Sequence, residues 1–298
     1  MYHYIRDAER TPFPSLKALR LSEFSAQLDW LAAGRTAVPY SEFERWQAAP
    51  GAADFLLTFD DGFIDHYSAA FPALHARGWG GVFFVAGAAL AGTPRLLNVH
   101  KTQFLLAALG AERFAEAVAG EARSDDATTA LGHRREVYRY DDAPDLVAKH
   151  RLNYEMPAAE AERVLSALFA RHLGDEVAFA RDLYLSPAMI REMAAGGMTF
   201  GFHTETHPVL SRLDRAAQRR EVAQGVAVIR ELTGQTGVPF CYPYGHAHTY
   251  NTDTLAVLDE AGYSLAFTTD RRLARAGQDP RLEVPRMDTR DLPPFERR

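Results

Sequence analysis

Two adjacent carboxylates, Asp60 and Asp61, stand directly after the apolar run LLTF and are followed by Gly62. Carboxylates can accept a proton or ligate a cation, so the pair is a candidate for hydrolytic chemistry. Gly62 permits the sharp turn by which the chain would leave a buried strand. Taken alone, however, Asp-Asp-Gly also fits an ordinary acidic turn, so its meaning depends on the groups that lie near it.

A second candidate group is the segment FHTETHP, in which His203 and His207 are four residues apart and Pro208 follows. Two imidazoles at this spacing can converge on one ion if the segment coils, and neutral imidazole nitrogen is a preferred zinc ligand. A His pair at this spacing can also be incidental. The segment is not a zincin motif, because no Glu follows the first His directly and a strand precedes it.

Two later segments complete the set of candidates. In YPYGHAH (242–248), Pro243 and Gly245 fix a turn that can aim a backbone N–H into a cleft, although alone the segment is merely a turn. The segment VPRMDTRDLP (284–293) places Arg286 and Asp288 at the last predicted strand.

Each candidate group follows a strand-like run, and these runs alternate with helical patterns. The alternation predicts an α/β fold with a parallel sheet, and seven or eight strands predict closure into a (β/α) barrel, whose strands deliver their C-terminal ends to one face. Ser22 is the expected N-cap of a helix that carries Phe24, Leu28 and Leu31, and Ser186–Pro187 open another. The runs are residues 2–5, 54–59, 81–87, 198–203, 238–243, 264–269 and 282–286.

The alternation stops between residues 98 and 185, a stretch far longer than an ordinary connection. The amphipathic runs 101–118 and 157–173 predict helices within it, and residues 124–136 are polar enough for a loop. We therefore expect a barrel of residues 1–97 and 186–298 with an inserted helical cap of residues 98–185. The cap could equally serve only to pack against the barrel or to form a dimer surface, so a homo-oligomer is an alternative.

The composition excludes several classes of protein. The 298 residues carry a net charge of −6 with 47% hydrophobic residues, which indicates a globular protein without the basic surface that nucleic-acid binding requires. Cys241 is the one cysteine of the sequence and is expected to be a small buried residue. No apolar run is long enough for a membrane span and no signal peptide is recognisable, so we expect a cytoplasmic protein.

Taken together, the motifs TFDDG, H-T-x-x-H-P and YPYG resemble those of the NodB-type polysaccharide deacetylases, which are metal-dependent carbohydrate esterases. The motifs occur in the family's order, and AFTTD (266–270) resembles a further family segment. The resemblance covers roughly residues 1–97 and 186–293. It implies a distorted (β/α) barrel, a divalent metal ion and hydrolytic removal of an N-acetyl group from a sugar, with release of acetate.

Carried over residue by residue, the resemblance makes Asp61, His203 and His207 the metal ligands and Asp60 the general base. The backbone N–H of Tyr244 would stabilise the oxyanion. The expected ion is zinc, with cobalt, nickel and iron as alternatives.

The sequence departs from the family pattern at two places. The arginine that opens the YPYG-like motif in many relatives is replaced by Cys241, and we expect Arg286 to supply that cation, although a structural Arg–Asp pair is the plainer interpretation. The family's late Leu-x-His, which provides the general acid, is absent. The candidates for the acid or for a substrate contact are His3, His246, His248 and His100, whereas His66 and His75 are expected on an outer helix.

The leading hypothesis is a deacetylase of an N-acetylated sugar, either a surface-glycan precursor or an oligo- or polysaccharide. An amidohydrolase for cyclic imides or ureides and a glycan-binding pseudoenzyme are the alternatives. The four residues Asp60, Asp61, His203 and His207 oppose the pseudoenzyme, because a protein that only binds has no chemical need for all of them.

Overall fold

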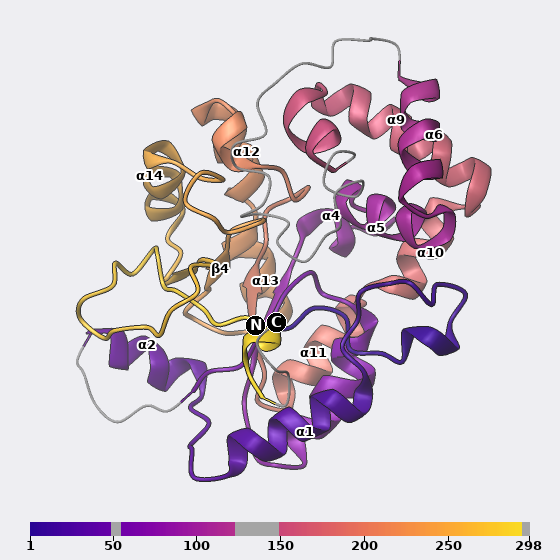
Figure 1. Cartoon of the computed structure of the whole chain (residues 1–298). Coiled ribbons are helices and arrows are strands. Elements are labelled where there is room, and N and C mark those ends of the chain that lie inside the picture. Colours follow the sequence, from indigo (N-terminus) through magenta and orange to yellow (C-terminus); the bar gives the residue numbers. More distant parts are fainter. Residues whose placement is uncertain (49–54, 123–148, 294–298) are drawn as a thin grey trace.

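The computed structural model describes residues 1–48, 55–122 and 149–293 and is built on a parallel five-stranded sheet (Figure 1). Adjacent strands in the order β1-β2-β3-β4-β5 pair in parallel, as the alternating pattern predicts. The strands are β1 (Thr58–Phe59), β2 (Val82–Val85), β3 (Thr199–Phe202), β4 (Phe240–Cys241) and β5 (Ala266–Phe267).

The sheet is extended at both ends by single parallel bridges, Tyr2 with Phe59 and Val284 with Phe267. The first and last predicted strands, residues 2–5 and 282–286, are therefore present only as bridged segments. The amino group of Met1 donates to the carbonyl of Met287 across 2.7 Å, which joins these two segments. The result is a curled half-barrel with bridged edges, so the expected distorted (β/α) barrel is confirmed.

Outer helices pack against this sheet through apolar faces. In α1 (Leu21–Ala32), Phe24, Leu28 and Leu31 are buried as their spacing predicts. The predicted N-cap at Ser22 is wrong, because α1 begins at Leu21 and the Glu23 carboxylate accepts the backbone N–H of Arg20. The other outer helices are α2 (Tyr40–Ala48), α3 (Phe71–His75), α11 (Pro187–Ala195), α12 (Arg215–Val222), α13 (Gly225–Thr233) and α14 (Thr252–Ala261).

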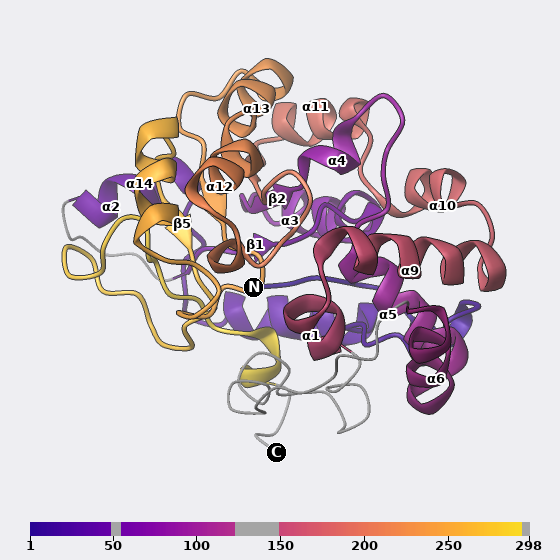
Figure 2. The same cartoon turned by 90° about the horizontal axis from the view of Figure 1, so that it is seen from above.

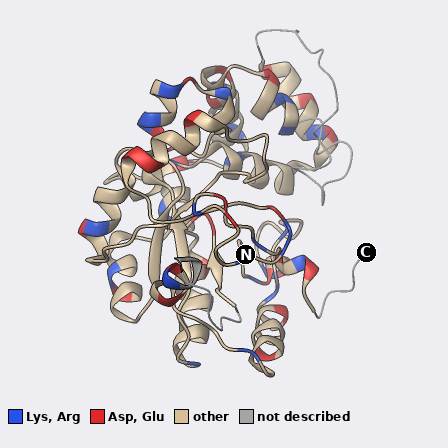
Figure 3. Ribbon diagram, turned by 90° about the vertical axis from the view of Figure 1, so that its left-hand side faces the viewer, with Lys and Arg blue, Asp and Glu red and all other residues tan. Residues whose placement is uncertain are grey.

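The start of α11 agrees with the sequence. Pro187 is its first residue, and the Ser186 hydroxyl accepts the backbone N–H of Met189 as an N-cap. Acidic and basic residues are interspersed over the outer helices (Figure 3), and some of them pair, such as Arg215 of α12 with Glu260 of α14 at 2.6 Å.

A second group of helices comes from the segment between β2 and β3. Figures 1 and 2 both show α5, α6, α9 and α10 gathered on one side of the molecule, away from α12 and α14. The predicted helix 101–118 is divided at Gly110, whose φ of +77° ends α5 before α6 begins. The bounds are α4 (Gly87–Leu90), α5 (Asn98–Leu109), α6 (Ala111–Glu121), α9 (Ala158–His172) and α10 (Glu176–Leu183).

These helices share a hydrophobic core with the barrel side of the molecule. Phe104, Phe114 and Phe169 are fully buried in one cluster with Phe63, which follows β1. The loop expected at residues 124–136 lies outside the described residues, and the boundaries of a separate cap stay a prediction. Within the described ranges, no helix has the length and apolar character that a bilayer span requires.

Candidate active site

The candidate residues lie at the C-terminal ends of the strands. Asp60 and Asp61 follow β1, His203 follows β3, and Tyr244 follows β4. Arg286 comes two residues after the bridge between Val284 and β5. Because the strands are parallel, one end of the sheet receives all five side chains, as expected for a barrel enzyme.

Unusual backbone conformations are concentrated at this end of the sheet. The four described non-glycine residues with positive φ are Asp61 (75°), Thr204 (65°), His207 (60°) and Tyr244 (63°). Each such conformation costs about 1–3 kcal/mol and persists only where the surrounding structure enforces it. Gly62 (φ +66°) completes the turn after Asp61, which agrees with the turn expected there.

Asp61, His203 and His207 form a compact buried group. The Nε2 atoms of His203 and His207 lie 3.5 and 3.6 Å from Oδ1 of Asp61. Two ligands bound tetrahedrally at zinc distances would be about 3.3 Å apart, so this separation suits a shared ion. Among the described residues Oδ1 of Asp61 is a buried acceptor without a hydrogen-bond partner. The group therefore fits a small divalent cation by geometry and donor chemistry.

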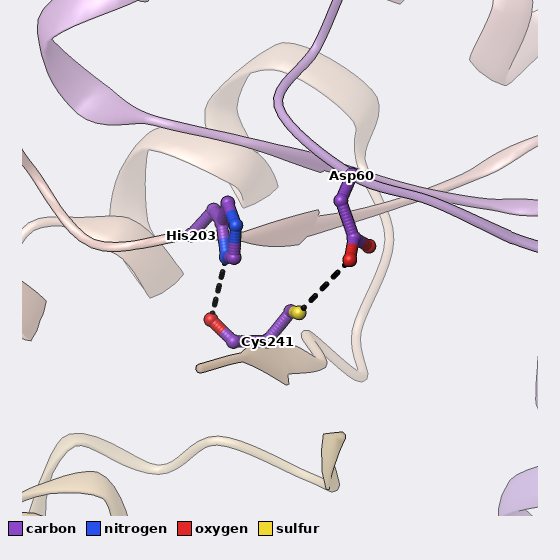
Figure 4. Close-up of side chains that lie close together, drawn as sticks. All are labelled: Asp60, His203 and Cys241. Carbon is purple, nitrogen blue, oxygen red and sulfur yellow. Dashed lines mark hydrogen bonds between the residues drawn. The ribbon is translucent and has the colours of Figure 1, made fainter. Parts of the chain in front are cut away.

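Hydrogen bonds orient the ring of His203 and fix the backbone that carries His207. Nδ1 of His203 lies 2.7 Å from the carbonyl oxygen of Cys241 (Figure 4), so the proton on Nδ1 leaves the Nε2 lone pair facing Asp61. The backbone N–H of His207 donates to the Thr204 hydroxyl at 2.9 Å. Glu221 of α12 accepts both the backbone N–H and the hydroxyl of Thr206, which holds the loop that carries His207.

Asp60, His203 and Cys241 form a second group whose ligand atoms lie close together (Figure 4). Here a cation is already supplied by the protein. Nη1 and Nη2 of Arg286 lie 2.8 and 2.9 Å from the two oxygens of Asp60, and Nη2 is also 3.0 Å from Sγ of Cys241. The guanidinium occupies both carboxylate oxygens, so the group around Asp61 is the better candidate for a metal.

The Arg286 side chain is fixed on several sides. Its Nε donates to the carbonyl of Thr268 and its Nη1 to the hydroxyl of Thr58. Burial by itself would raise the pKa of Asp60, but Arg286, followed by His3, outweighs it and holds the pKa well below its usual range. Asp60 is therefore an ionised carboxylate at neutral pH.

This geometry can be compared with known proteins. Residues 139–266 match the family model described as polysaccharide deacetylase. This part of the chain is thus similar to a polysaccharide deacetylase domain. The resemblance expected from the motifs is thereby confirmed. The match includes His203, His207 and Tyr244 and leaves Asp60 and Asp61 outside it.

Individual relatives of this chain are distant. YxkH of Bacillus subtilis strain 168 is 28% identical over 95 residues, which is 32% of this chain and 33% of that protein. The alignment thus spans about a third of the curated relative.

Among solved structures, the deacetylase PplD of Streptococcus pyogenes has a TM-score of 0.58 at 19% identity, with 96% of this chain and 89% of that chain covered. IcaB from Ammonifex degensii has a TM-score of 0.59 at 21% identity, covering 96% and 88%. At these identities the comparisons show that the fold is shared.

A cavity of about 850 Å³ lies beside the candidate residues. Asp60, Asp61, His203, His207 and Tyr244 line it. Another wall comes from the second group of helices, through Val99, Thr102 and Gln103 of α5. The helical segment between β2 and β3 therefore contributes directly to the cavity.

The remaining candidate histidines differ in position. His3 lines the cavity, its side chain is 46% exposed, and its Nε2 is 3.8 Å from Oδ2 of Asp60. His246 also lines the cavity and its ring stacks on that of His248. His100 is fully buried, and its Nε2 lies 3.3 Å from Oδ2 of Asp61.

His66 and His75 follow β1 on the outer helical turns, as expected, but only His75 is exposed. His66 is fully buried, with Nε2 3.1 Å from the carbonyl of His3. The sequence also gave no sign that Tyr184 would contact His100, since no spacing rule connects two residues 84 positions apart.

Proposed function

We propose that this protein is a metal-dependent hydrolase that removes the N-acetyl group from an N-acetylated sugar. The observation that carries the proposal is the Asp61–His203–His207 group beside the ionised Asp60 in one cavity of a polysaccharide deacetylase domain. A cation-binding group and a carboxylate base next to each other are the two parts that amide hydrolysis by water needs.

The donor set of one carboxylate oxygen and two imidazole nitrogens favours zinc, and cobalt, nickel and iron are the alternatives. When bound, the divalent ion supplies Lewis-acid polarisation of the amide carbonyl and lowers the pKa of bound water towards about 7. Asp61, His203 and His207 would hold the ion, and the other residues of the cavity would carry out the proton transfers.

Asp60 accepts the proton of the attacking water in this mechanism. Its ionised state and the direction of its oxygens are set by the bidentate contact with Arg286. A positioned base of this kind contributes roughly 10² to 10⁴ to the rate. Arg286 itself is a positioning residue, because its contacts are with Asp60, Thr58, Thr268 and Cys241.

Tyr244 is proposed to donate its backbone N–H to the developing oxyanion. Its φ of 63° and its position in the cavity wall support this role, because a residue in this conformation turns its backbone away from the direction of the strand. The Thr269 hydroxyl donates to the Tyr244 carbonyl at 2.8 Å and fixes the Tyr244–Gly245 peptide, which follows the one that carries the N–H. One oxyanion donor contributes about 3 kcal/mol to transition-state stabilisation.

His3 is the proposed general acid that protonates the leaving amine. It lines the cavity and lies 3.8 Å from Asp60, so it is close to the reaction centre and open to a substrate. His246 lines the same cavity and is the second candidate. The buried position of His100 next to Asp61 does not suit proton delivery to a substrate.

The substrate class is supported by the family model and by the size of the cavity. A volume of about 850 Å³ accommodates an oligosaccharide or a surface-glycan precursor. PplD was solved in complex with acetate, which is the product that N-deacetylation releases.

The test combines metal analysis of the purified protein with acetate release from a panel of N-acetylated sugars, assayed beside cyclic imides and ureides. We expect wild-type protein to hold about one divalent ion and to release acetate, and Asp60→Asn to keep the ion and lose turnover. Turnover of the cyclic compounds alone would establish the amidohydrolase instead. Sugar binding without any turnover would establish a pseudoenzyme.

A further inference from the structure

A chain of buried polar contacts leads from the helical segment to the proposed metal ligand Asp61. The backbone N–H of Leu97 donates to Oη of Tyr184 at 3.1 Å. Oη of Tyr184 lies 2.5 Å from Nδ1 of His100, and Nε2 of His100 lies 3.3 Å from Oδ2 of Asp61. All three side chains are almost completely inaccessible to solvent.

The positions of the protons in this chain follow from its donors and acceptors. Because Oη of Tyr184 accepts the Leu97 N–H, its own proton is directed to Nδ1 of His100, and the described residues offer it no other acceptor. An imidazole that accepts at Nδ1 carries its proton on Nε2 when it is neutral. Within the described residues this nitrogen makes no hydrogen bond, but it lies 3.3 Å from Oδ2 of Asp61, so the N–H of a neutral His100 is next to this carboxylate oxygen.

From this arrangement we propose that His100 and Tyr184 are positioning residues that fix Asp61 as a one-oxygen metal ligand, an inference that rests on the proposed metal-dependent function. His100 engages Oδ2, while Oδ1 faces His203 and His207 and is left for the ion. Partners of this kind orient metal ligands, and their loss typically costs 10-fold to 100-fold in metal affinity.

His100 does not have the position of a fourth ligand. The described group whose donor atoms lie within 4.8 Å of one another contains Asp61, His203 and His207 without His100. The rings of His100 and His207 are 6.4 Å apart, and His100 contacts the far oxygen of Asp61. It therefore acts on the ion through Asp61.

Contacts from the helical segment and from the barrel hold Tyr184, His100 and Asp61 in place. The next residue of α5, the buried Lys101, pairs with Glu162 of α9 at 3.0 Å and with Glu176 of α10 at 2.8 Å, which ties α5 to its neighbours. On the barrel side, the ring of Phe63 packs 4.8 Å from that of His100. The Leu185 N–H donates to the carbonyl of Gly62 at 2.8 Å, so the residue after Tyr184 is bonded to the residue after Asp61. The helical segment thus supports the proposed metal ligand Asp61 and also forms part of the cavity wall.

The experiment measures the dissociation constants of Zn²⁺ and Co²⁺ by chelator competition on the full chain, together with the visible spectrum of the Co²⁺ form. We expect His100→Leu to weaken Zn²⁺ binding 10-fold to 100-fold, and His100→Gln, which keeps an N–H near the Nε2 position, to recover most of the affinity. Tyr184→Phe should weaken binding by a smaller factor and serves as the second test if His100→Leu does not fold. Lys101→Met is the matched control, expected to lower the melting temperature with a Zn²⁺ affinity within about twofold of wild type.

The outcomes separate this inference from the proposed function. Wild-type protein that binds no divalent ion would refute the metal-dependent function and the inference with it. If wild-type protein binds the ion and both His100→Leu and Tyr184→Phe bind it with unchanged affinity, the positioning role of His100 and Tyr184 is refuted and the proposed function stands. A Co²⁺ spectrum of His100→Leu that shows a lost ligand would instead assign His100 to direct coordination.

Discussion

Arg286 and Asp60 are 226 residues apart in the chain, yet their side chains form a bidentate ion pair, with Nη1–Oδ1 and Nη2–Oδ2 distances of 2.8 and 2.9 Å. The pair is buried and lies against the thiol of Cys241, at the position where the family resemblance leads one to expect an arginine. The cation is thus supplied from the segment after the last bridge of the sheet instead of from β4. Since a guanidinium needs only the right direction of approach, two different strand ends can provide it.

Replacement of Arg286 by Met should leave Asp60 as a buried carboxylate without a cation. We expect a loss of about 3–5 kcal/mol in the free energy of unfolding and a fall in kcat of at least 10²-fold, with the metal content retained. Denaturant unfolding and acetate release measure the two effects. The double variant Asp60→Asn/Arg286→Met should recover most of the stability, and a single variant as stable as wild type would contradict the account.

Exchange of the two positions tests whether the origin of the cation matters. Cys241→Arg alone should destabilise the protein by at least about 1–3 kcal/mol, because it overfills a buried site and brings two guanidiniums together. The double variant Cys241→Arg/Arg286→Cys should be more stable than Cys241→Arg. Thermal unfolding compares them, and equal stability of the single and double variants would disprove that the two positions are interchangeable.

The sequence predicted the parts of the site that depend on local pattern. Asp60, Asp61, His203 and Tyr244 each follow a strand, and parallel strands bring their C-terminal ends together without further information. The contact of Arg286 with Asp60 was also expected from the sequence, since it required only that the last segment return to the first strand.

Other features depended on packing that no local pattern encodes. Tyr184 and His100 meet because α5 and α10 fold onto the residues after β1, a contact between distant segments. His66 lies on the π-helical turn His66–Ala70, whose wider winding changes which side chains face inward, so ordinary helical spacing does not predict its burial. The first predicted strand, residues 2–5, is present only as two bridges, because Tyr2 pairs with Phe59 and Ile5 with the distant Leu19.

His3 provides a test of the general acid. His3→Asn should lower kcat by roughly 10² to 10⁴ while the metal stoichiometry stays at the wild-type value, because His3 approaches Asp60 and not the metal group. Elemental analysis and steady-state kinetics are the measurements. His246→Asn, in the same cavity, is the comparison, and full activity of His3→Asn with a large loss in His246→Asn would transfer the role to His246.

Removal of the metal should be reversible and should destabilise the protein. Chelation is expected to abolish acetate release, and Zn²⁺ or Co²⁺ should restore it. At a free ion concentration of 100 times the dissociation constant, binding to the native state adds about 2.7 kcal/mol of stability. Thermal unfolding with and without Zn²⁺ measures this gain. Asp61→Asn should show no gain, and an undiminished gain in that variant would mean that the ion binds elsewhere.

The buried His66 should make the protein less stable in weak acid. Burial lowers the pKa of His66 to about 4, whereas an unfolded histidine titrates near 6.5, so between these values the unfolded state binds a proton that the native state does not. Stability is therefore complete above pH 6.5 and falls as the pH drops towards 4, by up to about 3 kcal/mol from this residue. Urea unfolding of wild type and His66→Leu at pH 4.5 and pH 7.5 measures the difference, which should shrink in the variant. His75→Leu removes an exposed histidine of the following helix and should keep the wild-type slope, and equal slopes in all three proteins would assign the acid sensitivity to other groups.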